Sequence, residues 1–320
     1  MTQPAIYITR NIPPAALDLL AQACAIRQWE SDDPVPYDVL TREVADIDGL
    51  YCLLTDRIDA ALLEHAPKLR VVSQMAVGYD NVDVAACTAR GIPVGNTPGV
   101  LTETTADLTF GLLLATARRI VEGANAVQAG QWRTWIPLWL TGPDVHGATL
   151  GLVGMGRIGL AVARRARGFD MRVLYHNRTP SAEAEAVGAQ YVDLDALLAR
   201  SDFVSIHCPL SPATRGLVSE AFLRAMKPSA MFINTARGPI VDEAALYKAL
   251  SEGWIAAAGL DVTTVEPIPM DSPLLSLPNC LILPHIGSAS VPTRTRMAVM
   301  AAENLLAGLA GERPPHCVNV

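Results

Sequence analysis

The fold is decided by the stretch Thr149-Leu150-Gly151-Leu152-Val153-Gly154-Met155-Gly156-Arg157-Ile158-Gly159, halfway along a chain of 320 residues. A mostly apolar, strand-like run leads straight into a Gly-x-Gly-x-x-Gly turn, and a helical pattern over residues 160–166 follows. In such a unit the first glycine makes the tight turn, the second lets the backbone approach a pyrophosphate, and the third allows close helix–strand packing. The stretch therefore predicts a dinucleotide-binding unit. Its predicted cofactor contacts are Gly154, Gly156, Arg157, Ile158 and Gly159.

Composition narrows the class of protein. Half of the residues are hydrophobic, which excludes an intrinsically disordered chain. The formal net charge of −7 argues against nucleic acid or an anionic membrane as the main partner. No apolar run approaches the roughly 20 residues of a membrane span. The six cysteines are scattered without Cys-x-x-Cys spacing, which favours reduced thiols, a cytoplasmic protein and no metal site.

Short apolar strands alternate with helical patterns along nearly the whole chain, which is typical of parallel sheets covered by helices. Because the glycine turn lies near residue 150, another folded unit must precede it. A long helical pattern over residues 291–309 is expected to return to that first unit. We predict an α/β fold of two Rossmann-like domains with parallel sheets. The dinucleotide-binding domain (residues 99–286) is inserted into a discontinuous, flavodoxin-like substrate domain (residues 1–98 and 287–320).

Two further segments stand apart from this alternation. Residues 101–122 predict one long helix that leads towards the glycine turn. Residues 131–144 fit neither the helical nor the strand period and are expected to form an extended loop. The tryptophans of this loop, Trp132, Trp135 and Trp139, indicate burial, either against another subunit or onto the chain's own domain.

Three ionisable residues, Arg237, Glu266 and His285, each follow a strand-like segment downstream of the glycine turn. In an open α/β sheet, ligands bind beyond the carboxyl ends of the strands, so we expect the three side chains to converge there. One arginine or one histidine after a strand is usually a solvated or structural residue. Three chemically complementary groups at equivalent places instead favour an active site.

The chemistry of these groups predicts a reaction. A guanidinium matches the geometry of a carboxylate, so Arg237 can hold a 2-oxo acid and polarise its keto oxygen. His285 can give a proton to that oxygen as a hydride arrives, or take one in the reverse direction. A neighbouring carboxylate, Glu266, would stabilise the imidazolium. The set predicts general acid–base catalysis of hydride transfer to or from a nicotinamide.

The residues after the second predicted strand of this domain bear on the choice of nicotinamide. An NAD-specific site carries an acidic residue roughly 20 residues beyond the glycines. Here the strand ends in Tyr175-His176-Asn177-Arg178-Thr179, which contains no carboxylate. Arg178 can pair with a 2′-phosphate, while Asn177 and Thr179 can hydrogen-bond to it. We expect NADPH to be preferred, with NADH also accepted.

Five stretches carry a resemblance to a known family: residues 77–83, 96–100, 154–159, 234–238 and 284–288. In their order and spacing, the chain resembles the D-isomer-specific 2-hydroxyacid dehydrogenases over essentially its whole length. Within that family, Pro137-Leu138-Trp139-Leu140 is most similar to the glyoxylate/hydroxypyruvate reductases. The resemblance implies that Arg237, Glu266 and His285 are the catalytic set.

The resemblance also implies further site residues and a homodimer. The tryptophan matching Trp139 is expected to reach the partner subunit's active site and to cap a small pocket. Asp261 is expected to meet the nicotinamide carboxamide. The implied substrate residues, besides Arg237 and His285, are Leu53, Val77, Gly78, Ser288 and Trp139. The implied cofactor residues, besides those named above, are Thr105, Pro209, Thr214, Thr235, Ala236, Asp261 and Gly287.

The predicted function is NADPH-dependent reduction of small 2-keto acids, glyoxylate to glycolate and hydroxypyruvate to D-glycerate, with His285 as general acid/base. One alternative is a D-2-hydroxyacid dehydrogenase that acts on another or bulkier 2-keto acid. An alternative from a different class is an NAD(P)-sensing binding protein of the corepressor type. Reduction of keto acids would separate an enzyme from a sensor.

Overall fold

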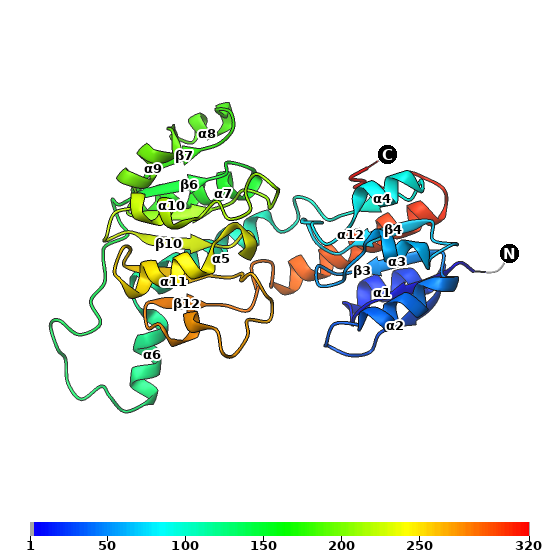
Figure 1. Cartoon of the computed structure of the whole chain (residues 1–320), viewed down its shortest axis with the longest axis horizontal. Helices are drawn as coiled ribbons and strands as arrows, with labels where there is room; N and C mark the ends of the chain where they lie inside the picture. Colours follow the sequence, from blue (N-terminus) through cyan, green and yellow to red (C-terminus); the bar gives the residue numbers. More distant parts are fainter. Residues whose placement is uncertain (1–2, 320) are drawn as a thin grey trace. The chain divides into compact units, whose positions relative to one another are not determined.

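The computed structural model describes residues 3–319 and forms two compact units (Figure 1). The first unit joins the residues up to Leu101 to those from Ala289 onward, and the second unit spans Thr102–Ser288. These limits lie a few residues from the predicted domain ends at 98 and 286. In the described part of the chain, no helix combines the length and the apolar character needed to cross a membrane.

The first unit is built on a five-stranded parallel sheet in the order β2-β1-β3-β4-β5. This is the 2-1-3-4-5 order of flavodoxin-like folds, as the sequence predicted. Every strand pairs in parallel with its neighbours, for example Leu50 with Val72. The strands are β1 (Ala5–Ile8), β2 (Ala25–Gln28), β3 (Gly49–Cys52), β4 (Val71–Gln74) and β5 (Val94–Gly95).

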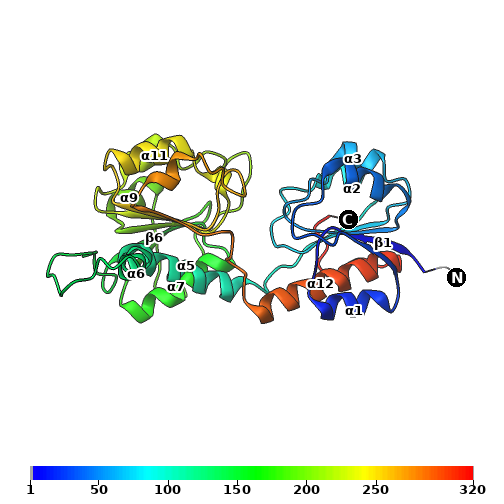
Figure 2. The same cartoon turned by 90° about the horizontal axis from the view of Figure 1, so that it is seen from below.

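Helices cover both faces of this sheet (Figure 2). The C-terminal helix α12 packs on β3 and β4, where the Tyr51 hydroxyl donates to the carbonyl of Ala298 at 3.1 Å and the Ser73 hydroxyl donates to that of Ala301 at 2.7 Å. The predicted return of this helix to the first unit is confirmed. The helices are α1 (Pro14–Ala21), α2 (Tyr37–Glu43), η1 (Val44–Asp46), α3 (Ala60–Glu64), α4 (Val84–Ala89) and α12 (Val291–Leu309).

The second unit contains a seven-stranded parallel sheet in the order β12-β11-β10-β9-β6-β7-β8. Strand β6 lies between β7 and β9, so the direction in which the chain adds strands reverses at β6. Such a reversal opens a crevice at the carboxyl edge where nucleotides bind. The strands are β6 (Thr149–Val153), β7 (Arg172–His176), β8 (Gln190–Tyr191), β9 (Phe203–Ile206), β10 (Met231–Asn234), β11 (Ala257–Leu260) and β12 (Cys280–Ile282).

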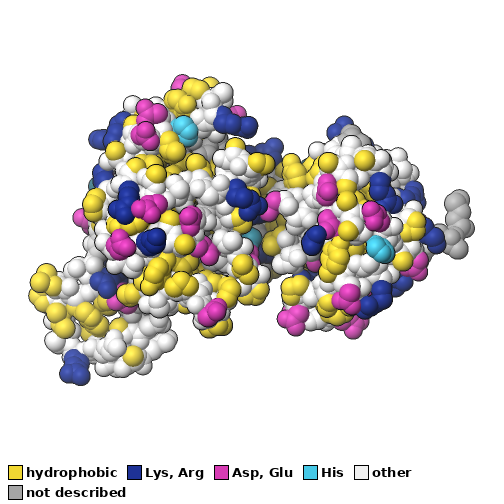
Figure 3. All heavy atoms as spheres, viewed as in Figure 1, with side chains coloured by type: hydrophobic (Ala, Val, Ile, Leu, Met, Phe, Trp, Pro, Cys, Tyr) yellow, Lys and Arg dark blue, Asp and Glu magenta, His cyan; other side chains and the backbone are white. Residues whose placement is uncertain are grey.

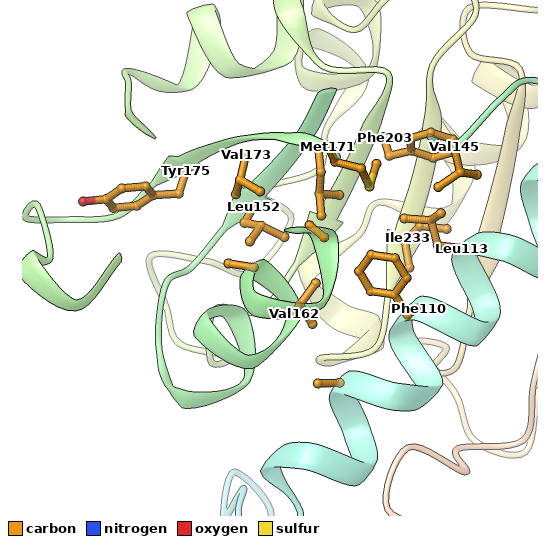
Figure 4. Packing of buried hydrophobic residues seen from close by; sticks show 14 of the residues in the cluster. Phe110, Leu113, Val145, Leu152, Val162, Met171, Val173, Tyr175, Phe203 and Ile233 are labelled. Atoms are coloured by element: carbon orange, nitrogen blue, oxygen red, sulfur yellow. The ribbon is translucent and has the colours of Figure 1, made fainter. Parts of the chain in front are cut away.

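Helices α5 and α7 lie on one face of this sheet, and α9 and α11 lie on the other (Figure 2). Figure 4 shows Phe110 of α5 and Val162 of α7 among the apolar side chains that face Leu152 and Ile233 of the sheet. The helical segments are α5 (Thr102–Ala117), α6 (Ile120–Gln128), α7 (Arg157–Ala166), η2 (Arg167–Phe169), α8 (Ala182–Ala186), α9 (Leu194–Arg200), α10 (Glu220–Ala225), η3 (Gly238–Ile240), α11 (Glu243–Ser251) and η4 (Pro273–Ser276).

The long helix predicted over residues 101–122 is wrong. The segment forms two helices, α5 and α6, with a break at Arg119, whose φ of 50° is left-handed. A close tertiary contact lies at this break. The backbone at Gly142 packs so closely on the end of α5 that a Cβ there would lie 1.9 Å from the carbonyl oxygen of Ala117. Residues 117–120 contain no glycine or proline that would have predicted the break from the sequence.

Candidate active site

The glycine turn connects β6 to α7, and at two of its three glycines there is no room for a Cβ atom. Gly154 has a φ of 99°, and a Cβ there would lie 2.4 Å from the Cys208 nitrogen. A Cβ at Gly159 would lie 2.3 Å from the Gly154 oxygen. Gly156 differs, because a Cβ there would meet nothing within 4 Å. The turn therefore keeps open space at the position where a pyrophosphate would approach the backbone.

Helix α7 begins at Arg157 directly after this turn, and no side chain in the described part of the chain caps its first N–H groups. Ser181 and Asp193 cap the neighbouring helices α8 and α9 in the usual way. Uncapped N–H groups and the positive end of the helix dipole favour a bound anion. The residues present thus fit the phosphates of a dinucleotide. Arg157 is exposed, Ile158 is half-buried and Gly159 is buried.

The structure brings Glu266 and His285 together. They follow β11 and β12, which are adjacent parallel strands, and His285 Nδ1 lies 2.7 Å from Glu266 Oε2. The other carboxylate oxygen of Glu266 accepts the N–H of Thr263 at 3.1 Å. Glu266 is therefore held from one side by backbone while it orients the imidazole from the other.

Arg237 follows β10, the strand next to β11, and its side chain is half-buried. The buried Asn234 fixes the turn before it, accepting the N–H of Ala236 and donating to the carbonyl of Arg237, both at 3.0 Å. A Cβ at Gly238 would lie 1.9 Å from the carbonyl carbon of Thr263, so the turns that carry Arg237 and Glu266 are in contact. Sequence reasoning missed this role of Asn234.

A buried carboxylate holds the loop that carries His285. The two oxygens of Asp261 accept the N–H groups of Ile286 at 2.8 Å and Gly287 at 2.7 Å, and its carbonyl accepts the N–H of His285 at 2.9 Å. Burial raises the pKa of Asp261, and the two N–H donors oppose that shift. His285 has a left-handed φ of 54°, which is strained for a residue with a side chain. The bonds to Asp261 hold it there.

Helix α5 carries Thr105 to the same edge of the sheet. Thr109, one turn later, donates to the carbonyl of Thr105 at 2.8 Å and lies 2.8 Å from the hydroxyl of Thr235. A Cβ at Gly287 would lie 3.4 Å from Thr105 Cγ2. Three predicted cofactor residues are therefore close together. Thr109, which joins two of them, was not predicted. Ser288 is buried at the end of the loop that carries His285.

The loop after β9 is closed by its own side chains. The Thr214 hydroxyl donates to the carbonyl of Pro209 at 2.7 Å and accepts the N–H of Ser211 at 2.8 Å. At the start of the loop, burial lowers the pKa of His207 to about 4, and its Nε2 lies 2.9 Å from the Ser205 hydroxyl. A neutral histidine thus packs beside the glycine turn, which sequence analysis did not foresee.

The end of β7 presents the residues expected to select the cofactor. Asn177 donates to the carbonyl of Thr179 at 3.3 Å, and the Tyr191 hydroxyl donates to the carbonyl of Asn177 at 3.2 Å. Arg178 is exposed, and within residues 3–319 no carboxylate forms an ion pair with it. These contacts shape the turn but leave the guanidinium available to a ligand.

The chain is similar in sequence to proteins of one known family. Residues 110–287 match the family model described as D-isomer specific 2-hydroxyacid dehydrogenase, NAD binding domain. A glyoxylate reductase from Korarchaeum cryptofilum is 53% identical over 319 residues, covering 99% of this chain and 96% of the relative. This chain belongs to the D-isomer-specific 2-hydroxyacid dehydrogenase family. It is an oxidoreductase with a nicotinamide-binding Rossmann domain.

Solved structures of other proteins have the same fold as this chain. A protein from Thermus thermophilus superposes with a TM-score of 0.93 at 48% identity, covering 98% of this chain and 99% of that one. An NADPH-dependent glyoxylate/hydroxypyruvate reductase from Sinorhizobium meliloti, solved with NADP and malonate, superposes with a TM-score of 0.88 at 37% identity, covering 99% and 97%. The likeness extends over both units of the dehydrogenase.

The other predicted substrate residues of the dehydrogenase lie in the first unit and in the loop after α6. Leu53 follows β3 and Val77 and Gly78 follow β4, so they belong to the carboxyl edge of the first unit's sheet. Trp139 is half-buried in the loop over residues 131–144. In the same loop, Trp132 is 63% and Trp135 is 80% exposed, so neither is buried on its own domain.

The glycine turn gives a testable contrast. Gly156→Ala should leave the protein folded, because the added Cβ meets open space, but should weaken NADPH binding on the order of 10-fold or more, since that space faces the expected phosphates. Gly154→Ala should lower the melting temperature, because both its φ and its neighbours reject a Cβ. Fluorescence titration and thermal unfolding measure the two effects.

Gly168→Ala is the matched control, because a Cβ there also meets nothing within 4 Å and the position lies after α7. It should change neither quantity. An unchanged NADPH affinity in Gly156→Ala would show that the cofactor phosphates do not bind at this turn.

Proposed function

We propose that this dehydrogenase is an NADPH-dependent reductase of small 2-keto acids, converting glyoxylate to glycolate and hydroxypyruvate to D-glycerate. The observation that carries the proposal is the 2.7 Å contact between His285 Nδ1 and Glu266 Oε2 at the carboxyl edge of the nucleotide-binding sheet. The names of the Korarchaeum cryptofilum and Sinorhizobium meliloti relatives, given above, support the substrate class.

In this proposal His285 is the general acid. Because the Nδ1–H of His285 donates to Glu266, the proton that His285 transfers is the one on Nε2. When bound, the reduced nicotinamide supplies the hydride that reaches the carbonyl carbon. His285 then completes the 2-hydroxy acid by protonating its oxygen, and Glu266 stabilises the imidazolium before that transfer. The reverse reaction uses the neutral imidazole as base.

Arg237 binds the anion. Its guanidinium offers paired donors to the substrate carboxylate and the keto oxygen, which orients the carbonyl and draws electron density from it. We assign Leu53 to the wall of the substrate pocket, Ser288 to a place beside the substrate, and the backbone of Val77 and Gly78 to the carboxylate.

The preference for NADPH rests on the end of β7. Arg178 is exposed, and no carboxylate follows His176 there to accept a ribose hydroxyl or repel a phosphate. An arginine at this place accommodates the 2′-phosphate of NADP. Asn177 and Thr179 complete the turn around it. NADH remains a substrate in this proposal, because nothing in the turn excludes it.

We further propose that the enzyme is a homodimer joined through α6 and the loop that follows it. Figure 1 locates α6 and the loop, and Figure 3 shows apolar side chains gathered on this part of the surface. Large exposed apolar patches mark interfaces. A cavity of about 760 Å³ lies between α6 and the starts of β11 and β12. A second copy of the chain would cover both, and Trp139 would reach its active site. The exposed residues are Ile120, Val121, Val127, Trp132, Trp135, Ile136 and Leu138.

Replacing the general acid tests the reaction. His285→Ala should lower kcat for glyoxylate with NADPH by about 10²- to 10⁴-fold, the usual contribution of a positioned acid–base group. The dissociation constant for NADPH should stay unchanged. His146→Ala, at an exposed histidine paired with Asp170 in the same unit, is the control and should keep full activity. Equal turnover by both variants would refute the assigned role.

Replacing Arg178 tests the cofactor preference. Arg178→Asp should shift the ratio of kcat/KM for NADPH over NADH by on the order of 10- to 100-fold towards NADH, because a hydrogen bond to a charged group contributes about 1.5–3 kcal/mol. Arg200→Asp makes the same change of charge at an exposed position after β8 and should leave the ratio unchanged. A ratio that moves equally in both variants would attribute the effect to net charge.

The dimer is tested by sedimentation. Trp135→Asp places a charge at a side chain that is 80% exposed in one chain and should shift the protein from dimer to monomer. Met270→Asp, at a similarly exposed apolar residue outside this surface, should remain dimeric. A wild-type protein that sediments as a monomer would contradict the proposal.

A further inference from the structure

Two buried amide side chains in the first unit hold the carbonyl groups of the loop after β4. Asn96 Nδ2 donates to the Val77 oxygen at 2.9 Å, and Gln74 Nε2 donates to the Gly78 oxygen at 3.3 Å. Both are more than nine-tenths buried. Asn96 is itself anchored, because its carbonyl accepts the side chain of Asn304 on α12 at 2.8 Å. The loop is thus fixed from the interior of the unit.

Fixing these carbonyls also fixes the direction of the next N–H groups. A trans peptide is planar, so its C=O and N–H point in opposite directions. The peptides at Val77–Gly78 and Gly78–Tyr79 are trans. The N–H groups of Gly78 and Tyr79 therefore point away from Asn96 and Gln74. Within residues 3–319, neither N–H meets an acceptor. The loop presents two adjacent donors, which suits an anion.

A third amide extends the same network to the loop after β3. Gln74 Nε2 also donates to Asn81 Oδ1 at 2.6 Å. Asn81 Nδ2 in turn donates to the Leu53 oxygen at 3.1 Å and to the Asp56 oxygen at 2.7 Å. The residue assigned to the pocket wall and the loop assigned to the carboxylate are therefore joined through two side chains. A change in one amide would move both.

We propose that Gln74, Asn81 and Asn96 are positioning residues for the carboxylate of the 2-keto acid. They do not touch the substrate; they orient the peptide groups that do. This inference rests on the proposed function. Neutral amides suit the task, because they hold the carbonyls without placing a negative charge beside an anionic substrate. A carboxylate side chain in their place would repel both the carbonyl oxygens and the substrate.

The test replaces each donor while keeping the fold. Gln74→Met keeps nearly the same volume without the donor, and Asn96→Ala removes the second donor. Each should raise KM for glyoxylate on the order of 10- to 100-fold, the range that follows from a small misplacement of a binding group. kcat at saturating glyoxylate and the dissociation constant for NADPH should each stay within about threefold, since the chemical groups are untouched.

Asn319→Ala is the matched control. The side-chain amide of Asn319 also makes hydrogen bonds within the first unit, donating to Thr88 Oγ1 and to the Ile92 carbonyl, both at 2.9 Å, but it touches neither loop. It should lower the melting temperature without changing KM. An unchanged KM in Gln74→Met and Asn96→Ala, in an active wild-type background, overturns the positioning role alone. A wild-type protein that does not reduce glyoxylate overturns the proposed function and this role together.

Discussion

The parallel pairing of β10, β11 and β12 is the constraint on which the proposed active site depends. The register sets Asn234 beside Leu260 and Leu260 beside Ile282, so all three strands end at one edge of the sheet. An antiparallel strand among them would send one functional group to the opposite edge. Because each loop beyond the strands is short, three residues distant in sequence need only local turns to reach a common place.

Backbone contacts then give those turns the precision that acid–base chemistry requires. Asp261 binds three successive residues of the His285 loop, and Thr263 binds Glu266 while its backbone lies against Gly238. A positioned proton donor loses much of its effect when it is displaced by about an ångström. The buried carboxylate of Asp261 therefore holds the imidazole of His285 in place through the backbone of its loop. Sequence reasoning had assigned Asp261 to the cofactor alone, a role that its remaining lone pairs leave open.

Much of this arrangement is predictable from sequence because its signals are local. The glycine turn, the strand ends before Arg237 and His285, and the helix over Val291–Leu309 each follow from a short pattern. The break at Arg119 and the contacts of the amides Gln74, Asn81 and Asn96 with the loops after β3 and β4 do not. They depend on which backbone groups the fold leaves beside a side chain, and residues far apart in the sequence supply them. The exposure of Trp135 could not be predicted either, because the sequence shows that a residue is apolar but not which chain covers it.

The most direct test of the proposed function is the steady-state kcat/KM of the purified wild-type protein for glyoxylate and hydroxypyruvate with NADPH, measured beside phenylpyruvate as a bulky 2-keto acid. We expect kcat/KM values of about 10⁴ M⁻¹s⁻¹ or more for the two small substrates, within the usual range for enzymes, and a much lower value for phenylpyruvate. Tight binding of NADPH without turnover of any 2-keto acid would contradict the proposed function and would indicate a nucleotide-sensing protein.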